Sequence, residues 1–434
     1  MRKISKLSLV AAVAVAGFST ANAQPLEEAI KNVEVSGSVV YRYDNFNDDK
    51  GTFNNGSGPE HHSEKNNYKI GLNLTSKVND YVKFNSRFLV ANANGDFAVG
   101  GLDAHKSSDA NPDVTLSHAN FAFTGIQNTT VIAGKQGLAT PYTVSLDSDG
   151  NEQTGTGVLA LSSIGPVTAG AGYFNQTNLD KSGNINGTKF ANNSGYNVTK
   201  VSDITNSTFT ADENLGSRDI YVATLQADLS PVKLESWYLD IADTLDSYTL
   251  VAKADFKPST DSKIGVEARY VSLTLDNGKK AGLDSNDNEM YRLAVTGNLG
   301  IFNAKVGYTG TSNKGGLTAF DQDADNATLG WNLSSNGIAD ADYWQGVLGV
   351  NILDNLNLSA NYGNLKADRP SGKNNGNFKD LEVEEVFGQL TYKMSKNLST
   401  YLRYGTYEEK YKNNGDKEKY SDQNRGRIQV EYTF

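Results

Sequence analysis

Residues 422–434, the last in the chain, read DQNRGRIQVEYTF. Apolar and polar side chains alternate strictly through the second half of this stretch, as they do on a β-strand with two unlike faces. One face carries the apolar Ile428, Val430, Tyr432 and Phe434. A strand with one oily face, one charged face and an aromatic end suits a barrel wall between lipid and water. It also suits a soluble sandwich whose polar face meets solvent, so the rest of the chain must distinguish the two.

The N-terminus has the features of a secretory signal. It carries three basic residues, an apolar run at residues 7–18 and the small-residue motif ANA directly before Gln24. The apolar run is too short for a spanning helix, and no later segment reaches the roughly 18 apolar residues that such a helix needs. We therefore expect residues 1–23 to be a cleaved signal peptide and residues 24–434 to be the mature protein. If that protein is a membrane protein, it must cross by strands.

The composition fits an exported, acidic protein. The 434 residues carry a formal net charge of −10, no cysteine and 22 tyrosines. The acidic charge argues against nucleic acid as a partner. Without disulfides, an exported chain must obtain its stability from hydrogen bonding and topology. Tyrosine at this level fits the aromatic belts of membrane proteins, because its ring prefers lipid while its hydroxyl prefers water.

From Val33 onward the sequence contains about eighteen segments with strand-like alternation and almost no helical periodicity. Short connections are expected near residues 77–81, 125–128, 164–166, 229–231, 257–261, 298–300, 353–355 and 395–397. Long polar connections are expected near residues 45–66, 95–113, 138–155, 176–216, 276–288, 312–341, 367–379 and 410–421. Long and short connections alternate, apart from a short one near residues 241–245. This sorting is typical of outer-membrane barrels, whereas sandwiches and propellers have no reason for it.

The predicted fold is therefore all-β, a transmembrane antiparallel β-barrel of about 18 strands with short periplasmic turns and long external loops. Every backbone polar group inside lipid must be paired within the protein, so the first strand should pair with the last. A barrel of this size encloses an aqueous channel instead of a packed core. We therefore expect the mature protein in the bacterial outer membrane.

Charged residues at inward positions suggest how this channel is narrowed. The basic set comprises Arg42, Arg87, Arg425 and Arg427, on the first, third and last strands. The acidic set comprises Asp147, Asp149 and Glu152, in the long connection at residues 138–155. We predict that this loop folds into the lumen and faces the arginines, because opposed charges would produce a transverse field at a constriction. The alternative is that these charges are ordinary solvated lumen residues.

Four stretches resemble the Campylobacter-type (epsilonproteobacterial) major outer membrane porin family. They are PLEEAIKNVEVSGSVVYRYD at residues 25–44, VIAGKQ at 131–136, GTGV at 155–158 and the terminal aromatic strand. The resemblance implies an eighteen-stranded, homotrimeric general porin with a mild preference for cations, whose constriction can hold a calcium ion. By family position, acidic residues of the inserted loop before Gly155 would bind this ion. Asn151 stands four residues before Gly155, so Asp149 or Glu152 would have to take that role.

The predicted function is passive diffusion of small hydrophilic solutes and ions across the outer membrane, in contact with outer-membrane lipid and lipopolysaccharide. No cofactor is expected to be required, with calcium as the candidate ion. Two other classes stay open. A substrate-specific channel would show saturable binding, usually along a line of lumen aromatics. A barrel acting mainly as a surface adhesin would depend on its external loops and have a plugged lumen.

Acidic residues also alternate at Asp321, Asp323 and Asp325, like the start of an EF-hand loop. The glycine and the terminal glutamate that such a loop requires are replaced by Asn326 and Asn332. We therefore expect this segment to be a solvated acidic loop on the external side, with a non-specific cation contact there as the alternative.

An enzyme needs a nucleophile, a base and an orienting group within reach of one another. His118 is the only histidine on an expected strand, and its neighbour Ser117 should point to the opposite face. We predict no enzymatic activity.

Overall fold

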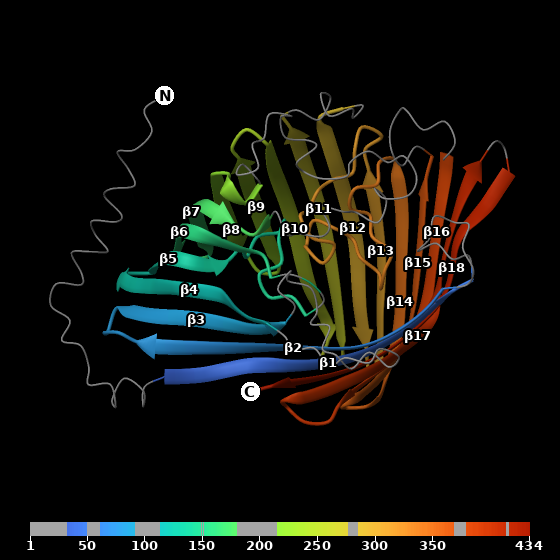
Figure 1. Cartoon of the computed structure of the whole chain (residues 1–434), viewed down its shortest axis with the longest axis horizontal. Coiled ribbons are helices and arrows are strands. Elements are labelled where there is room, and N and C mark those ends of the chain that lie inside the picture. The colour runs from blue at the N-terminus through green and yellow to red at the C-terminus, as the bar shows by residue number, and fades with distance from the viewer. Residues whose placement is uncertain are drawn as a thin grey trace.

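The computed structural model describes residues 33–49, 61–91, 113–148, 150, 152–179, 215–276, 285–368, 379–413 and 416–434. Within them, eighteen antiparallel strands form one closed sheet (Figure 1). The predicted fold class and strand number are confirmed. No helix of the described residues is long and apolar enough to cross a membrane. The expected signal peptide at residues 1–23 lies outside the described residues.

The strands follow one another around the wall in chain order. The first nine are β1 (Val33–Asp48), β2 (His61–Lys77), β3 (Val82–Ala91), β4 (Asp113–Ile126), β5 (Thr129–Gly137), β6 (Thr154–Ile164), β7 (Val167–Thr177), β8 (Ile220–Asp228) and β9 (Val232–Ile241). The others are β10 (Leu245–Ser259), β11 (Ser262–Leu275), β12 (Asp287–Leu299), β13 (Phe302–Thr311), β14 (Ala341–Leu353), β15 (Leu356–Ala367), β16 (Lys379–Lys393), β17 (Leu398–Asn413) and β18 (Asp416–Thr433). A short 3-10 turn, η3 (Leu215–Ser217), precedes β8.

The sheet closes where β1 meets β18. Their register runs from Ser38 opposite Thr433 to Asp48 opposite Gln423, and β1 pairs with β2 on its other side. The last residue continues the ladder, because Gly37 and Phe434 exchange backbone hydrogen bonds of 2.9 and 3.0 Å. In Figure 1 the blue β1 and the red β18 accordingly run together. Neither strand is left with an open edge, as a lipid environment requires.

Strand alternation separates a lipid face from a lumen face. Ile428 and Tyr432 are 43% and 44% exposed on the outside, whereas Arg425 and Gln429 on the same strand are each 6% exposed inside. An aromatic belt follows the outer face of every strand from β7 to β15. Its members are Tyr173, Tyr221, Tyr238, Tyr248, Tyr270, Tyr291, Tyr308, Trp344 and Tyr362. Such belts mark the boundary between hydrocarbon and water.

The predicted short connections are found, but one predicted long loop is wrong. Residues 410–421 were expected to form an external loop, whereas β17 and β18 remain paired as far as Asn413 and Asp416. A cross-strand ion pair on the outer face, between Lys419 of β18 and Glu408 of β17, supports this pairing. Lys419 also pairs with Asp422, and Lys410 with Glu408, each within its own strand. Opposite charges on neighbouring strands stabilise a hairpin whose polar composition alone resembles a loop.

We predict that closure depends on the backbone ladder of β18 more than on its side chains. Val430 lies between Tyr41 on β1 and Thr400 on β17. Val430→Pro removes a ladder N–H in an interior strand, so this variant should fail to form the closed barrel. Val430→Ala keeps the ladder and should fold. Electrophoretic mobility of unheated samples in SDS, which separates folded from unfolded barrels, measures both variants. A proline variant that folds as completely as the alanine variant would contradict the prediction.

Candidate functional site

Among the described residues, two loops lie inside the barrel. The first is the β5–β6 loop (residues 138–153), which crosses the lumen from one wall to the other. Lys69 on β2 donates to the carbonyl oxygens of Asp147 and, at 2.7 Å, Gly150. Farther along the loop, the Tyr142 hydroxyl accepts a 3.1 Å hydrogen bond from Thr249 on β10. Burial raises the pKa of Tyr142, so its hydroxyl stays protonated at neutral pH. The loop therefore touches both sides of the channel.

The second is the β13–β14 loop (residues 312–340), and it packs against the first. The backbone N–H groups of Phe320 and Asn326 donate to the carbonyls of Tyr142 and Pro141, each at 2.8 Å. The Gln153 side chain donates to the Phe320 carbonyl at 2.9 Å. The two loops thus form one partition in the lumen. The expectation of a solvated external loop here is wrong, because Phe320 and the neighbouring Asp321 are buried.

The β13–β14 loop is anchored to the wall at several strands. The buried carboxylate of Glu385 on β16 accepts the backbone N–H groups of Trp331 and Asn332 at 2.6 and 2.7 Å. Gly330 permits this approach, since a Cβ there would collide with the same carboxylate. On the other side, Arg292 of β12 donates to the Ala327 carbonyl at 2.9 Å. The middle of the loop is therefore held to the wall at both β16 and β12.

The predicted acidic residue Glu152 contacts an arginine directly. It is 2% exposed and forms a 2.6 Å ion pair with Arg87 on β3, and Ser117 donates to it at 2.8 Å. The Arg87 guanidinium lies over Gly71 of β2, where a Cβ would collide with it. This pair is buried, and removing one partner of such a pair costs about 3–5 kcal/mol. Glu152 and Arg87 thus fix the loop to the wall and neutralise each other, instead of facing across an open gap.

The other predicted acidic residues have different positions. Asp149 lies outside the described residues. Asp147 is buried, and one carboxylate oxygen from each of Asp147, Asp321 and Asp323 lies within 4.8 Å of the others. This acidic cluster lies where the two loops meet. Like charges at such distances repel, and oxygen ligands so arranged suit a hard divalent cation. The sequence indicated the alternation of Asp321 and Asp323 but not their meeting with Asp147.

The arginines do not form one wall. Arg42 donates to Gln429 at 2.9 Å and Arg427 to Asp44 at 2.5 Å, both across the β1–β18 seam. Arg87 lies apart on β3 with Glu152. The predicted set of four is therefore split between two places.

The seam arginines are covered by an aromatic side chain that the sequence interpretation overlooked. Trp331 of the β13–β14 loop lies with its ring centre 5.0 Å from the guanidinium carbon of Arg425 and 5.7 Å from that of Arg427. Arg425 also lies over Phe46 at 4.3 Å, and Arg403 of β17 approaches Trp331 at 5.1 Å. The sequence did contain a signal for this role, because Trp331 is one of only three tryptophans in the chain and lies within a polar loop.

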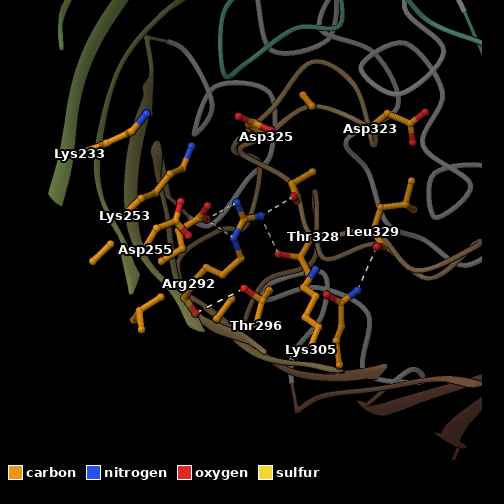
Figure 2. Close-up of a pocket in the computed structure, with 18 of the residues that line it drawn as sticks. Lys233, Lys253, Asp255, Arg292, Thr296, Lys305, Asp323, Asp325, Thr328 and Leu329 are labelled. Carbon is orange, nitrogen blue, oxygen red and sulfur yellow. Dashed lines mark hydrogen bonds and ion pairs between the residues drawn. The ribbon is translucent and has the colours of Figure 1, made fainter. Parts of the chain in front are cut away.

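A polar cavity of about 630 Å³ lies beside the partition (Figure 2). It extends from the β13–β14 loop along the inner wall to Pro231 in the short β8–β9 turn. A smaller cavity of about 260 Å³ continues toward β14–β17 and shares Lys305, Leu329 and Gln345 with the first. Charged side chains of both signs line the larger one. They are Lys233, Lys253, Arg292, Lys305, Asp255, Glu267, Asp323 and Asp325. The partition therefore narrows the lumen without filling it.

Several solved structures share this architecture. OpdQ of Pseudomonas aeruginosa is 15% identical, covering 94% of this chain and 99% of its own, with a TM-score of 0.62. OccAB3 of Acinetobacter baumannii is 15% identical, covering 92% and 99%, with a TM-score of 0.65. A BenF-like porin from Pseudomonas fluorescens Pf-5 is 15% identical, covering 93% and 99%, also with a TM-score of 0.65. At such identities the likeness establishes the fold alone.

A search of curated proteins gives no significant match. The comparison with family models is decisive, because one model extends over every residue of the chain. The model describes the Campylobacter major outer membrane protein and matches residues 1–434, and the chain belongs to that family.

Proposed function

We propose that this protein is a general diffusion channel that passes small hydrophilic solutes and ions across the bacterial outer membrane, with a mild preference for cations. The observation that carries the proposal is a closed barrel whose lumen is narrowed by two fixed loops but keeps a polar cavity of about 630 Å³. Membership of an outer-membrane porin family supports it. By the same resemblance, we propose a homotrimer in contact with outer-membrane lipid and lipopolysaccharide.

The charges at the partition support a preference for cations. Arg87 is neutralised by Glu152 and Arg427 by Asp44. The carboxylates of the acidic cluster, in contrast, gather where the two loops meet. A narrow polar passage beside clustered carboxylates favours cations, since carboxylate groups lining a pore attract them.

A substrate-specific channel is the second candidate, because the lumen holds aromatic side chains against arginines. Trp331, Phe387 and Tyr401 all lie within 5.1 Å of the Arg403 guanidinium carbon, measured to the ring centres. Such surfaces can retain solutes by stacking and by cation–π contact. Saturation of the current by an aromatic solute, which would stack on these rings, distinguishes this candidate from a general channel.

We also propose that calcium binds at the partition, but through a different ligand set from the one that the sequence suggested. Glu152 does not fit the role, because Arg87 and Ser117 already occupy its carboxylate. The acidic cluster of Asp147, Asp321 and Asp323 fits, since three carboxylate oxygens from two loops converge there. A bound calcium ion would neutralise their repulsion and tie the loops together.

Single-channel recording in a planar bilayer under a salt gradient tests the function. The wild-type protein should open in discrete steps, with a reversal potential on the cation side. Asp321→Asn combined with Asp323→Asn should move that potential toward the anion side, because two charges leave the partition. Asp354→Asn, in the exposed β14–β15 turn, is the control and should change nothing. If the double variant and the control have the same ion selectivity, the charges that set the cation preference do not lie in the acidic cluster.

Loosening the β13–β14 loop should widen the channel. Glu385→Ala leaves the buried N–H groups of Trp331 and Asn332 without their acceptor, at about 1–3 kcal/mol for each. We expect a larger and noisier open-channel conductance. The matched control is Glu384→Ala, whose side chain is on the outer face beside Tyr362. If the two variants conduct alike, the Glu385 anchor does not fix the loop.

Calcium should stabilise the folded protein through the acidic cluster. A ligand at one hundred times its dissociation constant contributes about 2.7 kcal/mol to stability. The midpoint of thermal unfolding should therefore rise in millimolar calcium and fall again with chelator. The rise should disappear in the Asp321→Asn, Asp323→Asn double variant. An equal rise in wild type and variant, or none in wild type, would reject this calcium site.

A further inference from the structure

Lys305 differs from the other cations that line the large cavity. Lys233 is paired with Asp228 at 3.0 Å, Lys253 with Glu235 at 3.0 Å and Arg292 with Glu267 at 2.6 Å. Lys305, on the inner face of β13, makes no hydrogen bond or ion pair with any described residue. One cationic side chain of this cavity thus has its hydrogen-bonding capacity unused.

The position of Lys305 makes that capacity available to a solute. Its side chain is half-buried and lines both the 630 Å³ and the 260 Å³ cavities, where they meet. Figure 2 shows it extending from the wall toward Thr328 of the β13–β14 loop, with Thr296 close to its base. Gln345 also lines both cavities. The ammonium group therefore lies on the short-turn side of the partition, near the ion pair of Arg292 and Glu267 and the neutral side chains of Thr296 and Gln345.

The chemistry of this setting favours an anion. An ammonium group donates short, charge-assisted hydrogen bonds to a carboxylate, and these are about twice as strong as neutral ones. Partial burial strengthens the attraction, because water screens it less. Arg292 and Glu267 also line the cavity, and their 2.6 Å ion pair leaves Lys305 as its unpaired cation among the described residues. Hydroxyl groups on the same solute would find Thr296 and Gln345 on the cavity wall.

We propose that this cavity is a binding subsite for small carboxylate-bearing solutes, and that Lys305 holds the carboxylate. The inference rests on the proposed channel function and deepens it. Clustered carboxylates at the partition disfavour anions, whereas a cation directly beyond them offers acids a place to bind. Small organic acids would then pass by a saturable step, while neutral solutes of the same size would diffuse without one.

Gluconate and sorbitol are suitable probes, because both are six-carbon polyols and only gluconate carries a carboxylate. Single-channel current is recorded at constant ionic strength while either solute is added. We expect gluconate to lower the open-channel current of the wild-type protein saturably and sorbitol to have no saturable effect. In Lys305→Gln the half-saturating concentration should rise about tenfold or more, as loss of a charged hydrogen-bond partner predicts. Lys305→Arg should retain the effect.

The matched control is Lys257→Gln, which removes an equal charge from an exposed lysine of β10 that lines neither cavity. It should behave like the wild type. The proposal is overturned if Lys305→Gln saturates like the wild type, if Lys257→Gln weakens the effect as strongly, or if sorbitol matches gluconate. Normal open steps in potassium chloride show that each variant is folded. A wild-type protein that never opens would contradict the proposed channel function. A wild-type channel that opens but shows no saturation by gluconate would contradict only the carboxylate subsite.

Discussion

The backbone ladder between β1 and β18 is the interaction on which the rest of the structure depends. In lipid an unpaired strand edge is prohibitively costly, so the sheet must close. Closure at eighteen strands leaves a wide lumen, and alternation along each strand then directs polar side chains into it. Buried arginines and carboxylates are acceptable on the inner wall because they face one another and the inserted loops. Arg427 with Asp44 shows this at the seam itself.

Two inserted loops narrow this wide lumen. The β5–β6 loop is held by Lys69 and by the buried pair of Arg87 and Glu152. The β13–β14 loop is held by Glu385 and Arg292. Loops fixed this firmly can place charges as accurately as strands do. The carboxylates of the acidic cluster lie where the loops meet, and one of them, Asp323, lines the same cavity as Lys305. In the proposed channel, selection by charge and retention of a solute would therefore use different side chains of neighbouring sites.

The sequence predicts the wall well and the interior poorly. Period-two alternation and the sorting of short and long connections are local signals, so strands such as β1 and β18 could be identified from them. Loop insertion depends on contacts between distant residues, as in Gly330 with Glu385, which no local pattern reveals. Polar composition gives two wrong predictions. It predicts an external loop at residues 312–341, although Trp331 and Leu333 are buried, and another at residues 410–421, where β17 and β18 remain paired.

The central claim is that the partition narrows the lumen but leaves it open. Swelling of liposomes that contain the purified, folded protein tests this most directly, because it reports solute entry without regard to charge. Arabinose should enter readily, and the swelling rate should fall steeply through disaccharides to the tetrasaccharide stachyose. Liposomes that do not swell in arabinose would show a plugged barrel, and equal rates for arabinose and stachyose would show a lumen that the loops do not narrow.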